Sequence, residues 1–122
     1  MSLIDLEDVA HVAAIVLSES GHSGATYELA GPEVLTPNQV AAAFNSHLGK
    51  DVRAEQIAIE TWRRNVEKSG LGQYQVNTLT KMFEYYNRCG LWGNSRILKD
   101  LLGRAPTTFP EFVKRIFRER PS

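Results

Sequence analysis

The sequence predicts a small α+β domain that is mostly helical, with a two-stranded parallel sheet from one βαβ unit followed by a cluster of helices. Two observations lead to this prediction. Short strand-like runs at residues 25–30 and 51–59 flank a helical pattern at residues 36–48, and such an order gives parallel strands joined by a right-handed crossover. From residue 60 onward, apolar residues recur at helical spacing. With 122 residues, the chain is large enough to bury one core.

The first helix is expected from Asp5 to about Ser18. Asp5 is a good N-cap residue, because its side chain can accept a hydrogen bond from a free backbone N–H of the first turn. The apolar residues that follow keep helical spacing: Leu6, Val9, Val12, Ala13, Val16 and Leu17. Glycines at 21 and 24 then end the helical pattern. Tyr27 and Leu29 share one face of the first expected strand.

The start of the second helix is the clearest local signal in the chain. Thr36 and Gln39 form a capping box, and Pro37 suits the first helical position. Gly49 is placed for the left-handed position just after the helix. The second expected strand, at residues 51–59, completes the predicted βαβ unit.

The remainder of the chain is expected to be helical. Helices are predicted at about 60–69 and 74–89, after a cap at Asn94 or Ser95, and after a capping box formed by Thr108 and Glu111.

The composition excludes several classes of protein. Basic and acidic residues are equal in number, 14 each, so charge provides no reason to expect nucleic acid or an anionic membrane as a partner. No apolar run reaches the roughly 18 residues of a membrane span. A single cysteine cannot form an internal disulfide, and residues 1–5 lack the features of a signal peptide. We therefore expect a cytoplasmic protein.

No set of residues with catalytic, cofactor-binding or metal-binding character is evident. The glycine pairs at 21/24 and 70/72 do not follow a strand, as the phosphate-binding turn of a dinucleotide site requires. His11, His22 and His47 have no spacing typical of metal ligands. Cys89 lies at a helix C-terminus, where the helix dipole disfavours a thiolate, so we interpret it as a packing residue. We predict no metal site and no catalytic residue in this chain.

The aromatic residues leave one open question. At helical spacing most of them are expected in the core. Trp62, Tyr85 and Trp92 are the candidates for lining a substrate pocket, because Tyr85 falls off the apolar face of its helix and Trp92 lies in a loop between glycines.

Four segments, in consistent order, resemble the NmrA-like family of extended and atypical short-chain dehydrogenases. They are residues 4–10 (IDLEDVA), residues 27–36 (YELAGPEVLT), residues 48–53 (LGKDVR) and residues 102–112 (LGRAPTTFPEF). The resemblance implies that the whole chain, residues 1–122, is one domain equivalent to the C-terminal, substrate-side portion of that family. It also implies that the N-terminal Rossmann domain is absent, and with it the residues that bind NAD(P).

Several expectations about function follow from the resemblance. The chain would be the substrate-binding or interaction domain of an NAD(P)-dependent oxidoreductase or a nucleotide-sugar-epimerase-like protein, and would not be an enzyme alone. A regulatory protein–protein interaction module of a redox-sensing NmrA-like regulator is the alternative. We expect apolar surface around the first helix and hence a homo-oligomer or a Rossmann-domain partner, with a small molecule as the candidate substrate.

Overall fold

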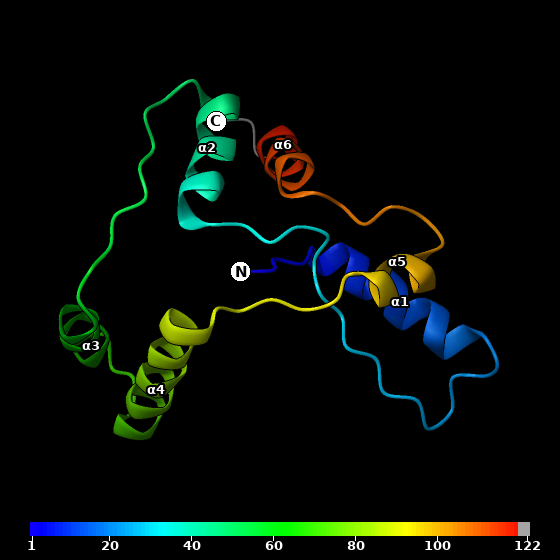
Figure 1. Cartoon of the computed structure of the whole chain (residues 1–122), viewed down its shortest axis with the longest axis horizontal. Helices are drawn as coiled ribbons and strands as arrows, with labels where there is room; N and C mark the ends of the chain where they lie inside the picture. The colour runs from blue at the N-terminus through cyan, green and yellow to red at the C-terminus, as the bar shows by residue number, and fades with distance from the viewer. Residues whose placement is uncertain (120–122) are drawn as a thin grey trace. The chain divides into compact units, whose positions relative to one another are not determined.

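A computed structural model describes residues 1–119 of the chain and contains six helices in this part (Figure 1). They are α1 (Leu6–Ser18), α2 (Pro37–Leu48), α3 (Ile59–Lys68), α4 (Gln73–Cys89), α5 (Arg96–Leu102) and α6 (Phe109–Glu119). None of them is long and apolar enough for a transmembrane segment, as far as the described residues go.

The chain folds as two compact units. The first comprises Met1–Ala54 together with the described chain from Trp92 onward, and the second comprises Glu55–Leu91. In the first unit α1 packs with α5 and α2 packs with α6, while α3 and α4 pack with each other in the second. In the sequence, the helical hairpin of the second unit thus lies between the two parts of the first.

The predicted helix starts are confirmed where capping chemistry specified them. Asp5 caps α1, with its carboxylate accepting a hydrogen bond from the backbone N–H of Glu7 at 3.0 Å. Thr36 and Gln39 form the complete capping box of α2. Gly49 ends α2 with φ of 61°, the left-handed conformation that glycine adopts without a steric penalty.

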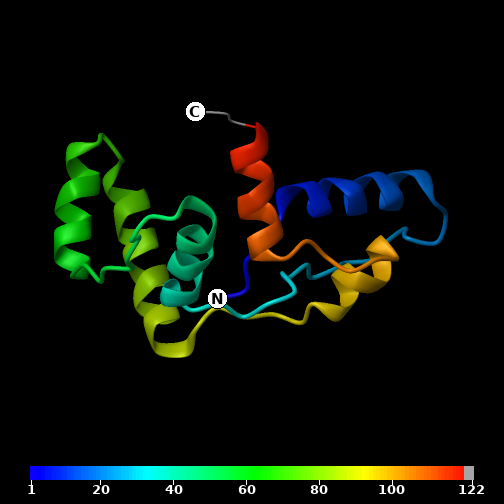
Figure 2. The ribbon, with the colours of Figure 1, turned by 90° about the horizontal axis from the view of Figure 1, so that it is seen from above.

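The prediction of a two-stranded parallel sheet is wrong, because no strand occurs within residues 1–119. Segments 25–30 and 51–58 run as connecting chain and are drawn without arrows in Figure 2. In the described part of the chain the isolated β-bridge is the antiparallel one between Ser2 and Val34. The βαβ pattern therefore reflects a local preference for extended backbone in two segments that do not pair with each other in the described structure.

One physical reason for this outcome lies at Val52. The Asn45 side chain donates to the Val52 carbonyl oxygen at 2.9 Å and accepts from the Val52 N–H at 2.5 Å. A side-chain amide thus satisfies both backbone groups that a neighbouring strand would otherwise bond. The end of the first expected strand is also packed closely against residues that are distant in the sequence, since a Cβ added at Gly93 would lie 2.7 Å from the Cβ of Ala30. A Cβ added at Gly31 would lie 1.5 Å from the carbonyl oxygen of Leu3.

The core of the first unit is small and lies where its helices meet. Three of its buried apolar side chains come from α1, α5 and α6: Val12, Leu98 and Val113. Ala41 on α2 and Ala30 in the connecting segment are also buried. Because small residues occupy two of these five positions, the core of this unit depends on close backbone approach as well as on side-chain volume.

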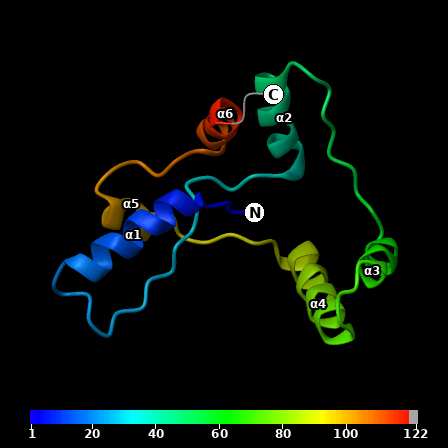
Figure 3. The same ribbon diagram turned by 180° about the vertical axis from the view of Figure 1, so that it is seen from behind.

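The second unit is a helical hairpin (Figure 3). Gly70, with φ of 87°, lies in the short turn between α3 and α4. Trp62 on α3 and Phe83 on α4 contact edge to face, with ring centroids 4.9 Å apart. Such pairs add about 0.5–1.5 kcal/mol beyond the effect of burial. Val76 is fully buried on α4, and the buried Thr80 hydroxyl donates to its carbonyl oxygen.

The face of α1 that does not contribute to the core is apolar and exposed. Leu6 is 78% and Leu17 is 87% exposed, and Ala10 and Ala13 between them are exposed as well. These residues are spaced by four, three and four positions, so they share one side of the helix. We call Leu6, Ala10, Ala13 and Leu17 the outer α1 face.

Candidate functional site

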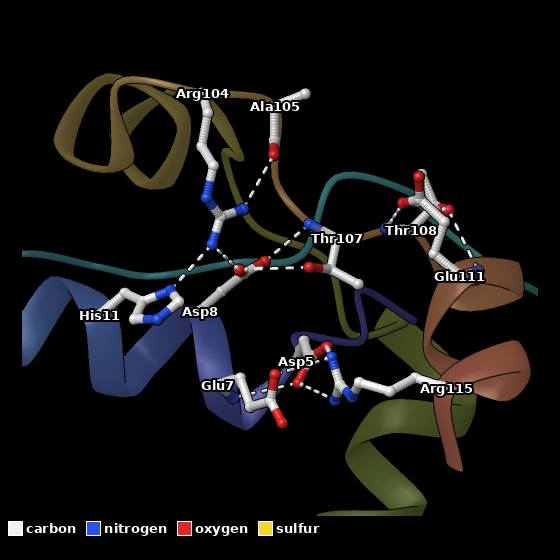
Figure 4. A network of polar contacts seen from close by, with 10 residues as sticks. All are labelled: Asp5, Glu7, Asp8, His11, Arg104, Ala105, Thr107, Thr108, Glu111 and Arg115. Atoms are coloured by element: carbon white, nitrogen blue, oxygen red, sulfur yellow. Dashed lines mark hydrogen bonds and ion pairs between the residues drawn. The ribbon is translucent and has the colours of Figure 1, made fainter. Parts of the chain in front are cut away.

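Two acidic residues at the start of α1 bind residues far along the chain (Figure 4). Asp5, besides capping α1, accepts two hydrogen bonds from the guanidinium of Arg115 on α6, at 2.7 and 2.9 Å. Arg115 also lies 3.0 Å from the carboxylate of Glu7. This bidentate pairing fixes the start of α1 against α6.

Asp8 makes the second of these connections. Its carboxylate accepts from the Thr107 backbone N–H at 2.6 Å, from the Thr107 hydroxyl at 3.2 Å and from the Arg104 guanidinium at 2.6 Å. Arg104 also donates to the Ala105 carbonyl oxygen and lies 2.9 Å from Nδ1 of His11. We call Asp5, Asp8, Arg104, Thr107 and Arg115 the carboxylate clasp.

The electrostatics of the carboxylate clasp indicate a structural role. The Arg115 hydrogen bonds are the main reason that the pKa of Asp5 is lowered, and they outweigh the effect of its burial. For Asp8, burial is the largest influence and by itself would raise the pKa. The hydrogen bonds from Thr107 and Arg104 together outweigh it, so the pKa of Asp8 is also lowered. Both groups stay ionised with their acceptors occupied, so neither is suited to proton transfer near neutral pH.

A small apolar pocket of about 200 Å³ lies beside the carboxylate clasp. Its lining is contributed by the N-terminal segment and the start of α6: Leu3, Ile4, Asp5, Thr107, Thr108, Phe109 and Phe112. The Asp5 carboxylate is already bound to Arg115, and Thr108 is bound to Glu111 in the predicted capping box. This pocket therefore offers little free polar chemistry to a ligand.

The second unit contains a larger open cleft of about 510 Å³, which we call the hairpin cleft. Residues from the segment before α3, from α3 and from α4 line it: Gln56, Ile57, Ala58, Ile59, Trp62, Phe83, Glu84 and Asn87. Ligand sites in proteins are typically apolar concavities of roughly 300–1,000 Å³ with a few polar groups. The hairpin cleft has this composition, with two aromatic rings and three polar side chains.

The three aromatic residues predicted to line a substrate pocket have different surroundings. Trp62 lies in the hairpin cleft. Tyr85 is exposed on α4, next to Tyr86 and beneath the guanidinium of Arg88, and it is not among the cleft residues. Trp92 is 67% exposed and belongs to the first unit. That Trp62, Tyr85 and Trp92 line a substrate pocket stays a prediction.

Sequence reasoning missed the residues that surround Trp62. Phe83 belongs to the apolar face of α4, and the helical spacing of residues 79, 82, 83 and 86 was a signal for its pairing with Trp62. Glu84 and Asn87 had no signal, because their place at the cleft depends on how α3 and α4 pack. Arg104 and Arg115 were likewise unrecognised as partners of the N-terminal carboxylates.

Among residues 1–119, no group of three or more histidine, cysteine, aspartate or glutamate side chains is placed to hold a metal ion. Nδ1 of His22 contacts the Tyr27 hydroxyl at 2.7 Å, and the His47 ring stacks on Phe117. The interpretation of Cys89 as a packing residue is wrong, because the thiol is exposed at the end of α4.

The described residues contain no phosphate-binding turn of the kind that holds a dinucleotide. A phosphate-binding turn requires glycines between a strand and a helix N-terminus. Gly21 and Gly24 follow α1, and Gly70 and Gly72 connect two helices. No strand precedes either pair within residues 1–119.

Comparison with known proteins gives the chain a family. The NmrA-like family matches residues 1–113. Quinone oxidoreductase 2 of Escherichia coli (strain K12) is 33% identical over 110 residues, which are 90% of this chain and 38% of that protein. The NADPH complex of the same enzyme superposes with a TM-score of 0.79 at 31% identity, covering 96% of this chain and 41% of that one.

Two further relatives differ in what their names describe. An NAD(P)H azoreductase of Xenophilus azovorans is 29% identical over 93% of this chain and 40% of its own length. Prestalk A differentiation protein A of Dictyostelium discoideum is 25% identical over 93% of this chain and 38% of its own length.

The chain therefore belongs to the NmrA-like family, as the resemblance of its sequence segments implied. It is related to NAD(P)H-dependent quinone oxidoreductases and azoreductases. It spans about two fifths of the length of the relatives it matches.

Proposed function

We propose that this chain is the substrate-side, C-terminal portion of an NmrA-like NAD(P)H-dependent oxidoreductase, and that a Rossmann-type portion supplies the cofactor. One observation carries this proposal: the family matches residues 1–113 of the chain, yet the chain spans only about two fifths of the length of its relatives. The lack of a phosphate-binding turn within residues 1–119 supports the same division of labour. The chain alone would bind no nicotinamide cofactor and work in the cytoplasm.

The outer α1 face is our candidate for the contact with that Rossmann-type portion. Leu6 and Leu17 expose most of their side chains to water, and the alanines between them allow another backbone to approach closely. Clustered exposed apolar residues of this kind mark interfaces. The occupant that we propose is the Rossmann-type portion, and a second copy of this chain is the competing outcome.

A fusion experiment tests the proposed function. The chain would replace the equivalent part of E. coli quinone oxidoreductase 2, and NADPH oxidation would be followed with a quinone as acceptor. We expect quinone-dependent turnover by the fusion and no NADPH binding by this chain alone in a calorimetric titration. Tight NADPH binding by this chain alone would refute the proposal, as would a folded fusion that binds NADPH without reducing any quinone.

Matched variants test the contact surface within the same fusion. Leu17→Asp places a charge on the outer α1 face and is expected to lower turnover by loosening the two portions. Ser20→Asp adds the same charge at an exposed position after the helix and should leave turnover unchanged. Equal effects of the two substitutions would argue against the outer α1 face. If this chain sediments as a dimer and Leu17→Asp makes it a monomer, the outer α1 face binds a second copy of the chain.

A regulatory function is the second candidate, and one observation favours it. Prestalk A differentiation protein A, a relative over 93% of this chain, is named for a role in differentiation and not for a reaction. In this case the outer α1 face would bind a regulatory protein. A fusion that binds NADPH, fails to reduce any quinone and captures a defined regulator through Leu17 would support this candidate.

A further inference from the structure

We propose that the hairpin cleft binds a planar aromatic cation, and that Glu84 selects for its positive charge. The site lies wholly within residues 56–87, in one compact unit. The inference concerns ligand binding by this chain without any cofactor, so it stands or falls separately from the proposed oxidoreductase function.

The shape of the cleft favours a flat ligand. The rings of Trp62 and Phe83 meet at 88°, so they form a corner. A planar ring system can lie on one of these rings and meet the other with its edge, and both are favoured arrangements for aromatic groups. Ile57 and Ile59 extend the apolar lining on the side of the segment that precedes and begins α3. A volume of about 510 Å³ accommodates a ligand of two or three fused rings.

The charge of the cleft favours a cation. Glu84 is the one charged residue among the residues that line it, and Gln56 and Asn87 are neutral amides. No lysine or arginine of the described chain forms a salt bridge with Glu84. Arg88, one turn further along α4, lies over the ring of Tyr85 instead. The Glu84 carboxylate is therefore available to a ligand.

The contrast with the pocket beside the carboxylate clasp strengthens this assignment. There the only carboxylate, that of Asp5, is neutralised by Arg115. The hairpin cleft is lined both by Glu84, which forms no salt bridge in the described chain, and by two aromatic rings, and rings attract cations through their negative faces. The two attractions act on the same ligand charge, so an aromatic cation is favoured over a neutral or anionic molecule of the same shape.

Fluorescence of a single tryptophan tests the proposal. Trp92→Phe leaves Trp62 as the only tryptophan of the chain, and Trp62→Phe leaves Trp92, which lies in the other unit. We would titrate both variants in the dark with methylene blue, a planar aromatic cation, and repeat the binding measurement by equilibrium dialysis. Saturable quenching is expected in the variant that keeps Trp62 and not in the variant that keeps Trp92.

Charge selectivity is the decisive measurement. Glu84→Gln, made in the Trp92→Phe background, should weaken methylene blue binding about fivefold, the loss expected for one exposed ion pair of about 1 kcal/mol. Binding of menadione, an uncharged quinone, should change less than twofold. Glu67→Gln removes a carboxylate of the same unit that lies outside the cleft and should affect neither ligand.

Each contrary outcome overturns a defined part of the inference. An unchanged affinity of the Glu84→Gln variant for methylene blue would refute selection by Glu84. Equal losses in the Glu84→Gln and Glu67→Gln variants would mean that methylene blue responds only to the overall charge. Quenching of Trp92 with the same affinity as Trp62 would refute binding in the hairpin cleft. Circular dichroism of each variant confirms that α3 and α4 remain folded.

Discussion

Replacing Asp8 with asparagine should destabilise the chain far more than removing an exposed carboxylate would. Asp8 is only 1% exposed, and its two oxygens accept three hydrogen bonds from Thr107 and Arg104. Asparagine has the same shape but only one acceptor oxygen. If this oxygen keeps the bond from the Thr107 N–H, the new NH₂ group faces the Arg104 guanidinium, which is also a donor.

The magnitude follows from these contacts. A hydrogen bond to a charged group contributes about 1.5–3 kcal/mol, and breaking a fully buried pair costs about 3–5 kcal/mol. The Arg104 side chain is 43% exposed, so water can replace part of its lost hydrogen bonding. The cost should therefore fall in the range for a single hydrogen bond to a charged group, below the range for a fully buried pair. We expect the free energy of unfolding to fall by about 2–3 kcal/mol, and Tm to fall by roughly 10 °C for a chain of this size.

Urea denaturation followed by circular dichroism measures this change. Asp100→Asn is the matched control, because Asp100 also pairs with an arginine in the same unit, at 3.6 Å from Arg96, but on the surface. An exposed pair of this kind contributes at most about 1 kcal/mol. A Tm for Asp8→Asn within error of that for Asp100→Asn would refute the assigned role of the carboxylate clasp.

Three further predictions concern backbone packing, capping and pH. Gly31→Ala should lower the free energy of unfolding by at least about 3 kcal/mol or prevent folding, because the added Cβ would lie 1.5 Å from a backbone carbonyl oxygen. Gly103→Ala, which has open space around the added Cβ but a φ of 66°, should cost only about 1 kcal/mol by urea denaturation. Similar losses of stability in the two variants would contradict the predicted clash at Gly31. Thr36→Ala should lower the free energy of unfolding by about 1 kcal/mol, because the capping box with Gln39 is lost. Thr36→Ser should retain most of the stability of the unaltered chain. An unchanged stability of Thr36→Ala would show that the cap contributes nothing. The lowered pKa of Asp8 should stabilise the fold fully at pH values above its ordinary pKa of 3.8, and this contribution should be lost as the pH falls through the lower pKa of the folded state. Unfolding free energies measured from pH 7 to pH 2 should therefore fall more gently below about pH 4 in Asp8→Asn than in the unaltered chain, and parallel curves would contradict this.

Local chemistry along the chain was sufficient for most helices and their ends. A capping box at Thr36 and Gln39, an N-cap at Asp5 and a glycine at position 49 each act within one helical turn, so the interactions that they make do not depend on the rest of the fold. The family resemblance was equally accessible, because it rests on short ordered segments and the family matches residues 1–113.

The predicted sheet failed because a strand needs a partner. Residues 25–30 and 51–58 have the composition of strands, yet their backbone groups find other contacts, such as the Asn45 side chain at Val52. Extended preference is local, but a hydrogen-bonded ladder is a property of two segments at once.

The candidate site likewise combines features that the sequence indicated with features that depend on how the chain packs. The sequence alone was enough to identify the family, the helix starts and the aromatic character of Trp62. It did not indicate that Asp8 would bind Thr107 and Arg104, residues about a hundred positions away, or that Glu84 would line the same cleft as Trp62 and Phe83. These contacts arise only when distant segments pack, because charge pairing and cleft shape depend on distances in space and not on spacing along the chain.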